Sequence, residues 1–394
     1  MKSAKMNKRL RVLFVTENMP TPPIAGSSQR TAILLRAISE VADTEIFLLR
    51  SNQAKDFLIK SNFKVAGNYD VHTRKNFWIN LLRVVFPMRD YRSDKCVENK
   101  LRETFIKGDF DILIGRYVSP SLKAGLANIG PAVIDVDDID ISVLQNRIKS
   151  SQTSWFMAMI LKYRLFIIEK KFRSLLKNYK ALFLSSAKDK LILPHRNTHI
   201  VPNIPFNESK SSELSLSSGI NVLWVGSFNH RVNLDGLDSF IKKQWPIIIE
   251  KFPYAVLRVV GSHLPEKYAK QWEGGRNISV AGFVENLDVE YKNAAFTIVP
   301  LWDGAGTKIK VLESLMFKRT AVVTSHAARG FDVLVEENAI LVSDTDRHMV
   351  DQVVMLLENE KLRNSMEDKG YELVKENYSY SCVSAVVSDV LNDF

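Results

Sequence analysis

Short apolar runs alternate with amphipathic stretches along most of the chain. In the first half, runs rich in Leu, Ile, Val and Phe predict buried strands at residues 10–15, 44–49, 111–116, 132–136 and 181–185. In the second half, similar runs begin at residue 221 and lie at 256–261, 278–284, 296–301, 320–324 and 339–342. Helical spacing fills the gaps, for example at 31–41 and 233–250. Strands that alternate with helices predict α/β architecture with parallel, doubly wound, Rossmann-like sheets.

A polar, serine-rich stretch separates the two alternating halves. Residues 205–218 read PFNESKSSELSLSS, lack apolar periodicity and are typical of a linker. A chain of 394 residues also exceeds what one hydrophobic core usually serves. We therefore predict four parts, namely a first Rossmann-like domain at 1–203, a linker or hinge at 204–219, a second Rossmann-like domain at 220–378 and a C-terminal helix at 379–394.

The first candidate ligand site lies in a unit made of a strand, a loop, a helix and a second strand. The unit spans residues 296–325 and turns at a corner that contains Gly304 and Gly306. Glycines permit a tight backbone there, and the free N–H groups of the following helix start, near Thr307 and Lys308, are suited to bind an anion. The corner therefore predicts a phosphate site, although glycine before a helix is also common without any ligand.

Two charged residues on the helix after this corner extend the prediction. Lys310 and Glu313 lie three positions apart, on one side of the first turns. A cation there could neutralise phosphate while the carboxylate accepts hydrogen bonds from sugar hydroxyls, which together describe a nucleotide-sugar pocket. The alternative is an ordinary solvated ion pair. Gly304 and Gly306 fit only two glycines of the dinucleotide fingerprint, and Ile309 occupies the third place, so a dehydrogenase is disfavoured.

The segments PLWDGAGTKIKVLESLMFKRTAVVTSHAARGFD, VLWVGSFNHRVNLDGLDSF and HIVPNIPF resemble glycosyltransferase family 4, among the group 1 glycosyltransferases of GT-B fold. The chain is most similar to the bacterial exopolysaccharide-type sugar transferases. The resemblance implies two domains that face a cleft, a nucleoside-diphosphate-sugar donor, and transfer to a hydroxyl of a glycan or lipid-linked acceptor. It also implies retention of anomeric configuration, no cofactor and no metal.

The resemblance assigns the diphosphate to the first strand of the second domain as well. Gly226 fits the glycine of that turn, but Ser227 follows it where many members have arginine. We therefore expect Arg231, Lys308 or Lys310 to supply the positive charge. The resemblance also implies that Lys310 and the helix start stabilise the leaving diphosphate, so Lys310 is a catalytic candidate.

Three further positions complete the donor site that the resemblance implies. Gly282 and Phe283 match the place where backbone and an apolar side chain hold the base, although an aromatic at a strand end is more often a core residue. Glu313 matches the glutamate that binds the ribose. The sugar-facing glutamate that many members carry falls on Ala305, so we expect backbone N–H groups of the corner to replace it.

In the first domain, two loops follow predicted strands and are candidate ligand sites. Gly26 and Ser27 match the paired glycines of the resembling family in the first loop, where Ser27 could equally cap a helix. Asp137 and Asp138 follow the strand of VIDVDDID, and Asp137 occupies a place that is often histidine. We expect one of the two to assist acceptor deprotonation or orientation. Helix capping and Mg²⁺ binding are the alternatives for this carboxylate cluster.

Two insertions in the first domain are basic and aromatic, at residues 74–92 and 143–180. The second contains nine Lys or Arg and the single acid Glu169, and Phe156, Met159 and Tyr163 follow helical spacing. Such a helix could rest on an anionic membrane surface, or it could pack on the core with a basic outer face. Both interpretations stay open on sequence alone.

Composition indicates the cellular compartment and the kind of binding partner. Cys96 and Cys382 are far apart and suggest neither a disulfide framework nor a metal site, which favours a reducing, cytoplasmic location. No signal-peptide core or membrane-spanning run is predicted, so any membrane contact would be peripheral, on the cytoplasmic face. The net charge of +10 predicts an anionic partner, but no nucleic-acid-binding motif accompanies it, and we expect no nucleic acid.

The prediction from sequence is therefore a glycosyltransferase of GT-B fold. Two other functions remain open, a nucleotide-sugar epimerase on the same fold and a nucleotide-sugar binding protein without catalysis. The absent first glutamate keeps the second of these open.

Overall fold

The computed structural model describes residues 9–21, 26–50, 63–70, 91–137, 154–193, 195–205, 219–304 and 306–394, with isolated positions at 55, 58–59, 141, 144–145 and 148. The chain divides into two compact units. Unit 1 comprises Met1–Phe206 and Tyr380–Phe394, and unit 2 comprises Asn207–Ser379. Most of the predicted linker, residues 206–218, lies outside the described residues.

Unit 1 is built on a parallel sheet of seven strands in the order β3-β2-β1-β4-β5-β6-β7. The strands are β1 (Leu10–Thr16), β2 (Ala42–Leu48), β3 (Val65–Asn68), β4 (Ile112–Arg116), β5 (Ala132–Val136), β6 (Ala181–Leu184) and β7 (Thr198–Ile200). Central strands such as β4 and β5 are buried along their whole length, which explains their continuous apolar runs. The strand order reverses between β1 and β4, so the loops after these strands lie at a topological switch point.

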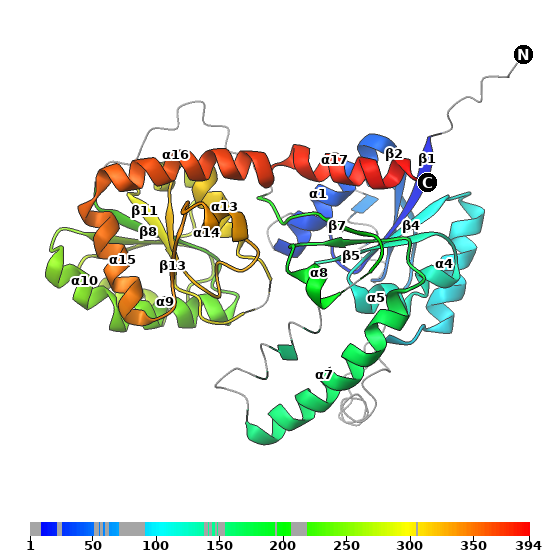
Figure 1. Cartoon of the computed structure of the whole chain (residues 1–394), viewed down its shortest axis with the longest axis horizontal. Helices are drawn as coiled ribbons and strands as arrows, with labels where there is room; N and C mark the ends of the chain where they lie inside the picture. Colours follow the sequence, from blue (N-terminus) through cyan, green and yellow to red (C-terminus); the bar gives the residue numbers. More distant parts are fainter. Residues whose placement is uncertain are drawn as a thin grey trace, which may run out of the picture. The chain divides into compact units, whose positions relative to one another are not determined.

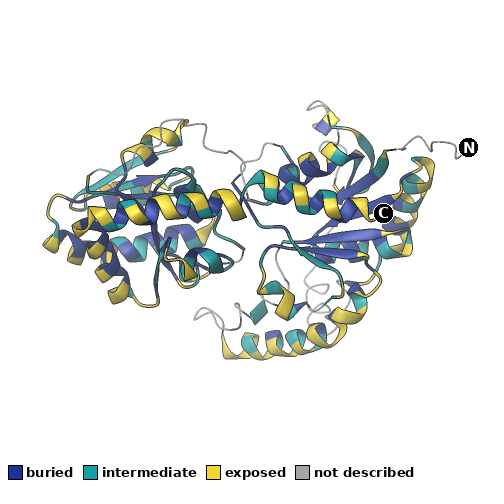
Figure 2. Ribbon diagram, turned by 45° about the horizontal axis from the view of Figure 1, so that its top comes forward, coloured by how far each residue is buried: buried dark blue, intermediate teal, exposed yellow. Residues whose placement is uncertain are grey.

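Helices flank this sheet. They are α1 (Gly26–Val41), α4 (Lys95–Lys107), α5 (Val118–Lys123), the short 3₁₀ turn η2 (Leu126–Asn128), α7 (Trp155–Leu176), α8 (Asp189–Ile192) and α17 (Tyr380–Asn392). In Figure 2 the central strands are buried and the outward faces of the helices are exposed, while the edge strands β3 and β7 are half-buried. Asp94 caps α4 by accepting from the backbone N–H of Cys96 at 2.9 Å, as expected of an aspartate before a helix.

The last helix, α17, packs against α1 although some 340 residues separate them in sequence (Figure 1). Val383, Val387 and Val390 bury its apolar side. The Arg36 guanidinium lies 3.8 Å from the centre of the Tyr380 ring, and the Tyr380 hydroxyl donates to Glu40 at 2.7 Å. The C-terminal segment therefore belongs to the unit in which the chain begins.

Unit 2 carries a second parallel sheet, of six strands in the order β10-β9-β8-β11-β12-β13. These are β8 (Asn221–Val225), β9 (Val256–Val260), β10 (Ile278–Gly282), β11 (Phe296–Val299), β12 (Ala321–Thr324) and β13 (Leu341–Ser343). The strand order reverses between β8 and β11, so the loops after these two strands form the switch point of this unit. Both units thus confirm the predicted α/β class with doubly wound parallel sheets.

The helices of unit 2 cover both faces of its sheet. They are α9 (Arg231–Lys243), α10 (Trp245–Lys251), α11 (Glu266–Glu273), α12 (Leu287–Lys292), α13 (Ile309–Met316), α14 (Asp332–Glu336), α15 (Asp346–Glu358) and α16 (Glu360–Asn377). The single helix predicted at 233–250 is wrong. The structure breaks it at Gln244, and Pro246 at the start of α10 cannot donate the backbone hydrogen bond that a continuous helix needs.

Candidate functional site

The corner between β11 and α13 adopts the backbone that its glycines allow. Gly304 has φ 112° and Gly306 has φ 72°, a region that other residues rarely enter. The Gly304 N–H donates to Asp303 Oδ1 at 2.6 Å, and the Lys308 ammonium donates to the Gly306 carbonyl at 3.1 Å. After Thr307, whose carbonyl accepts from Ile309 N–H at 3.1 Å, the chain enters α13.

Two residues that the sequence did not predict hold the carbonyl of Gly304. His326 Nε2 lies 2.7 Å from this oxygen, and Arg329 donates to it at 3.0 Å. Burial, together with the positive charges of Arg329 and Lys308, lowers the pKa of His326 to about 4. The imidazole is therefore neutral at physiological pH. Both side chains follow β12 in the segment HAARG and restrain the corner from the neighbouring strand.

Lys310 reaches from α13 to the turn after β8. Its ammonium donates to Asn233 Oδ1 at 3.2 Å and lies 4.6 Å from the centre of the Trp224 ring. A Cβ on Gly226 would lie only 2.6 Å from the same nitrogen, so any larger residue there would displace the lysine. Burial and the nearby Lys308 lower the pKa of Lys310 to about 7, against the opposing charge of Glu313.

The turn after β8 is packed tightly against its surroundings. A Cβ on Gly261 would lie 1.8 Å from the Gly226 carbonyl oxygen, so the loop after β9 also requires glycine. Asn233 donates to the Ser227 carbonyl at 2.6 Å, and the hydroxyls of Ser262 and Ser227 are 3.3 Å apart. Asn233 thus binds both Lys310 and the backbone of this turn, and it fixes one against the other.

Glu313 lies one turn after Lys310 on α13. The buried Tyr291 hydroxyl donates to Glu313 Oε2 at 3.2 Å, and the Tyr291 ring stacks on Phe317 at a centroid distance of 4.4 Å. Burial raises the pKa of Glu313, while the hydrogen bond from Tyr291 and the charge of Lys310 oppose the rise. Glu313 is therefore oriented by a rigid aromatic partner that the sequence did not reveal.

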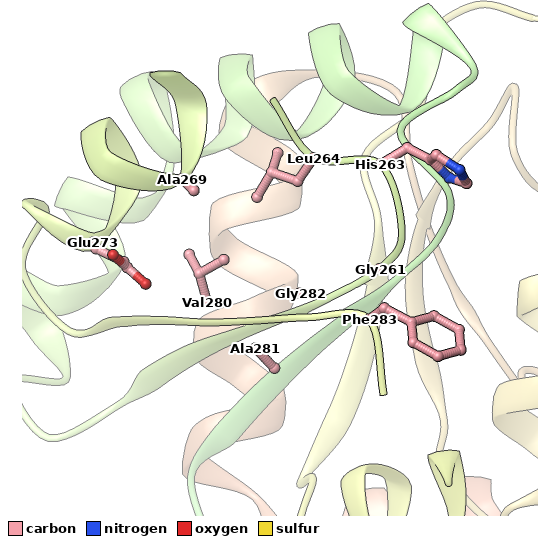
Figure 3. Close-up of a pocket in the computed structure, with 9 residues that line it drawn as sticks. All are labelled: Gly261, His263, Leu264, Ala269, Glu273, Val280, Ala281, Gly282 and Phe283. Atoms are coloured by element: carbon pink, nitrogen blue, oxygen red, sulfur yellow. The ribbon is translucent and has the colours of Figure 1, made fainter. Parts of the chain in front are cut away.

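A pocket of about 340 Å³ adjoins this region at the ends of β9 and β10 (Figure 3). Glu273 lies at its α11 side, and Phe283 and His263 lie at the opposite side. Phe283 is 72% exposed and follows Gly282, which has φ 68°. The core alternative for Phe283 is therefore wrong, and its ring is free to stack on a planar ligand.

The remaining donor-side candidate, Arg231, has a different setting. It stands in the first turn of α9, its side chain is 74% exposed, and it pairs with Asp235 at 2.8 Å. Lys310 is the cation that the structure brings to Gly226. Among the described residues, no group of three or more His, Cys, Asp or Glu side chains is placed to hold a metal ion.

In unit 1, a buried ion-pair network lies behind the end of β5. Asp135 accepts hydrogen bonds from Arg30 of α1 at 2.6 Å and from Arg116 of β4. Arg30 also donates to the Val201 carbonyl at 2.8 Å. All three charged side chains are almost fully buried, so the charge of each must be balanced by the opposite charges of the others.

Asp137, a predicted catalytic candidate, lies at the edge of this network. Its carboxylate accepts from Asn203 at 2.8 Å and from Arg116 and the Tyr117 hydroxyl at 3.3 Å each. Burial favours its neutral form, but the charges of Arg30 and Arg116 outweigh it and hold the pKa of Asp137 below its usual range. Asp137 is thus ionised and held in place. Asp138 lies outside the described residues.

Tyr117 adopts φ 61° and ψ 150°, a conformation that is costly for any residue except glycine. Its ring lies 4.4 Å from the Arg116 guanidinium, and its hydroxyl reaches Asp137. Such strain persists only where the surroundings enforce it, and it occurs often at functional sites.

Gly26 begins α1, and the Ser27 carbonyl accepts from the Thr31 hydroxyl at 2.8 Å.

Comparison with known sequences finds a family match within unit 2. Residues 219–359 match the sequence profile of the family described as "Glycosyl transferases group 1". Unit 2 contains a group 1 glycosyltransferase domain. The chain is also 22% identical over 291 residues to an uncharacterized 44.6 kDa protein in the cps region of Klebsiella pneumoniae, covering 71% of this chain and 74% of that protein.

Solved structures match both units and establish the GT-B fold. Sucrose-phosphate synthase of Thermosynechococcus elongatus is 13% identical, with a TM-score of 0.63 and coverage of 98% of this chain and 99% of that chain. Anabaena HepE in complex with UDP is 11% identical, with a TM-score of 0.62 and coverage of 98% and 100%. S. aureus TarM in complex with fondaparinux, α-GlcNAc-glycerol and UDP is 11% identical, with a TM-score of 0.59 and coverage of 97% and 100%.

Proposed function

We propose that this glycosyltransferase moves a sugar from a nucleoside-diphosphate-sugar, bound in unit 2, to a hydroxyl group of a glycan or lipid-linked acceptor. The observation that carries this proposal is the meeting of Lys310 with Gly226 at the switch point of the unit 2 sheet. Open α/β sheets bind ligands at this place, beyond the carboxyl ends of their strands. A cation, two glycine turns and a helix start converge there.

The diphosphate is assigned to the Gly304 to Thr307 corner and the Gly226 turn. Backbone N–H groups at the start of a helix are suited to bind an anion, and Lys308 and Lys310 add positive charge at the start of α13. During transfer, the bond between the anomeric carbon and the phosphate oxygen breaks, and negative charge develops on the leaving diphosphate. Preorganised donors and cations stabilise that charge, which is usually the largest single contribution to such catalysis.

The nucleoside is assigned to the same unit. Glu313, oriented by Tyr291, is suited to accept hydrogen bonds from the ribose hydroxyls. The exposed ring of Phe283 beside Gly282 is suited to stack on the base. The HepE and TarM structures are complexes with UDP, and this supports a uridine nucleotide as the first candidate here.

The acceptor is assigned to unit 1, near Asp137 and the strained Tyr117. Because Asp137 is ionised and held by three partners, it is suited to orient the attacking hydroxyl and to accept a hydrogen bond from it. Asp138 remains a candidate for proton transfer on sequence grounds. We further propose that the reaction retains anomeric configuration and needs no metal, with Lys308 and Lys310 in the place of a divalent cation.

A thermal-shift panel of nucleoside diphosphates and their sugar conjugates tests donor binding. A ligand that binds only the folded protein raises its apparent stability by mass action, so one base should stand out. Incubation with the stabilising nucleotide sugar and a panel of glycan and lipid-linked acceptors then tests transfer.

The same experiment separates the two alternative functions. An epimerase would convert the nucleotide sugar when no acceptor is present, and a non-catalytic binding protein would be stabilised by the donor but would give no product with any acceptor. The proposed transferase requires both stabilisation by a donor and product that depends on an acceptor.

A further inference from the structure

The N-terminal half of α7 exposes a row of large apolar side chains. Trp155, Met159, Tyr163 and Phe166 are spaced by four, four and three residues, so they share one face of the helix. Their exposed fractions are 74%, 55%, 51% and 62%. We call these four residues the α7 stripe. The alternative of a core-packed helix with a basic outer face is wrong for the residues that suggested it, because Phe156, Met159 and Tyr163 are exposed.

A different face of α7 attaches the helix to unit 1. Leu161, Ile168, Phe172 and Leu176 are buried, and the Phe172 ring packs edge-on against Tyr91 at a centroid distance of 5.7 Å. Figure 2 shows exposed residues along the outer side of this helix. The α7 stripe is therefore not needed to anchor the helix, and its exposure calls for a separate reason.

Positive charge accompanies the α7 stripe. Lys170 and Arg173 continue the same face at spacings of four and three residues after Phe166, and both are exposed. The helix contains five cations and the single acid Glu169; the cations are Lys162, Arg164, Lys170, Lys171 and Arg173. An apolar row thus leads directly into a cationic one.

We propose that the α7 stripe docks on an anionic phospholipid bilayer, with the helix axis along the surface. Trp and Tyr favour the boundary between headgroups and acyl chains, where their rings are buried and their polar atoms stay hydrated. Lys170 and Arg173 then meet anionic headgroups. The row from Trp155 to Phe166 extends about 16 Å along the helix at 1.5 Å per residue, enough for a shallow attachment.

Two observations favour this occupant. Among the helices of the described residues, none could span a bilayer. α7 itself carries five cations and Glu169 among its 22 residues, too many charges for a spanning helix, so we place it along the surface. A second copy of the chain would bring the same five cations against its own, and like charges at close range oppose association. A bilayer that carries negative charge complements both the apolar and the cationic parts of the face.

Membrane docking is a property separate from the proposed transferase activity, and it can be measured without nucleotide sugar. The full chain is co-sedimented with vesicles of neutral phosphatidylcholine, and with vesicles that also contain phosphatidylglycerol. We expect at least about tenfold stronger partition into the anionic vesicles, and a loss of this difference at high salt. Equal partition into both kinds of vesicle would overturn the proposal.

Paired variants test the residues. Trp155→Ser with Phe166→Ser, and separately Lys170→Glu with Arg173→Glu, should each lower partition by about tenfold or more. The matched controls are Leu191→Ser with Tyr254→Ser, both 83% exposed, and Lys267→Glu with Lys361→Glu. The controls should partition like the unchanged chain. An equal fall in variants and controls would overturn the assignment to α7.

Two further measurements keep the result interpretable. With brominated lipids, tryptophan fluorescence should be quenched, and Trp155→Phe should reduce this quenching more than Trp302→Phe or Trp78→Phe does, while Trp224, Trp245 and Trp272 are fully buried. Sedimentation equilibrium without lipid should give the same mass for the unchanged chain and for the Trp155→Ser, Phe166→Ser variant. A dimer that this variant dissociates would instead assign the face to a second copy and would contradict the proposal.

Discussion

The ammonium group of Lys310 lies 4.6 Å from the centre of the Trp224 ring. Trp224 belongs to β8 and Lys310 to α13, so this contact joins the two strand-to-helix connections that meet at the switch point of unit 2. The aromatic face and the partial enclosure accommodate the lysine, but they provide no full counter-charge. An arriving diphosphate would supply that charge, and several measurable consequences depend on this expectation.

Replacement of Lys310 should impair transfer severely. Lys310→Ala removes the cation that we assign to the leaving diphosphate, and loss of one such electrostatic contact typically lowers kcat by about 100-fold or more. Steady-state kinetics with the donor identified by thermal shift would measure the effect. The control is Lys242→Ala, because Lys242 pairs with Asp238 on the exposed side of α9. Near-normal turnover in Lys310→Ala would remove Lys310 from the mechanism.

Donor affinity should fall as pH rises above about 7. Burial lowers the pKa of Lys310 to about 7, so the free protein carries a protonated lysine below that pH and a neutral one above it. A bound diphosphate favours the protonated form, so binding above pH 7 takes up a proton and weakens by up to about tenfold per pH unit. Each phosphate of a nucleotide sugar has one ester and one anhydride linkage, so its single acidic group is fully ionised and does not titrate near neutrality.

Isothermal titration calorimetry in buffers of different ionisation enthalpy would measure that proton uptake directly. Lys310→Met keeps the length of the side chain without a titrating group, and it should bind donor weakly with a nearly flat pH dependence. Proton uptake that persists in Lys310→Met would assign the titration to another group.

Tyr291 should act through Glu313. Tyr291→Phe removes the hydrogen bond at 3.2 Å but keeps the stacking on Phe317, so the fold should persist and donor affinity should fall by about three- to tenfold. Glu313→Ala should have a larger effect. In the double variant, Tyr291→Phe should add little, because its partner is already gone. Additive losses would show that Tyr291 acts on the donor by some other route.

The buried network of unit 1 should dominate the effect of Arg116 on stability. Arg116→Ala leaves Asp135 with one cation instead of two, and breaking a buried pair in this way typically costs about 3–5 kcal/mol. Urea unfolding, combined with hydrogen exchange of the β5 amides, would localise the loss to unit 1. Lys270→Ala breaks an exposed pair with Glu266 and should leave unfolding unchanged.

Removal of divalent metal should leave transfer intact. Lys308 and Lys310 are assigned the charge that a metal would otherwise supply, so activity after EDTA treatment should match activity with added Mg²⁺. The measurement is the initial rate in both conditions with the same donor and acceptor. A rate that collapses in EDTA and returns with Mg²⁺ would contradict the metal-independent mechanism.

Local spacing predicted much of the fold and the donor corner. Apolar runs bounded by helical patterns sufficed for most of the strands, because a strand buried on both faces has a continuous apolar sequence. Gly304 and Gly306 were identifiable because a tight turn before a helix needs positive φ angles, which both adopt. The edge strand β3 has no such run and was not predicted.

The ion-pair network could not be predicted, because it depends on register between distant strands. Arg116 and Asp135 are direct partners in the β4 and β5 pairing, while Arg30 is 105 residues away from Asp135. Likewise, His326 and Arg329 reach Gly304 only because β12 lies beside β11. The spacing of residues 155–166 predicted a helix, but only packing decided which of its faces is buried.

The central claim is that the Gly304 corner, with Lys310, binds a diphosphate and Glu313 binds the ribose. A crystal structure of the full chain soaked with the nucleoside diphosphate selected by thermal shift tests this most directly. The account predicts phosphate oxygens within hydrogen-bond distance of the N–H groups at the start of α13 and of Lys310, with the ribose beside Glu313. A nucleotide bound elsewhere, with this corner unchanged and empty, would contradict the account.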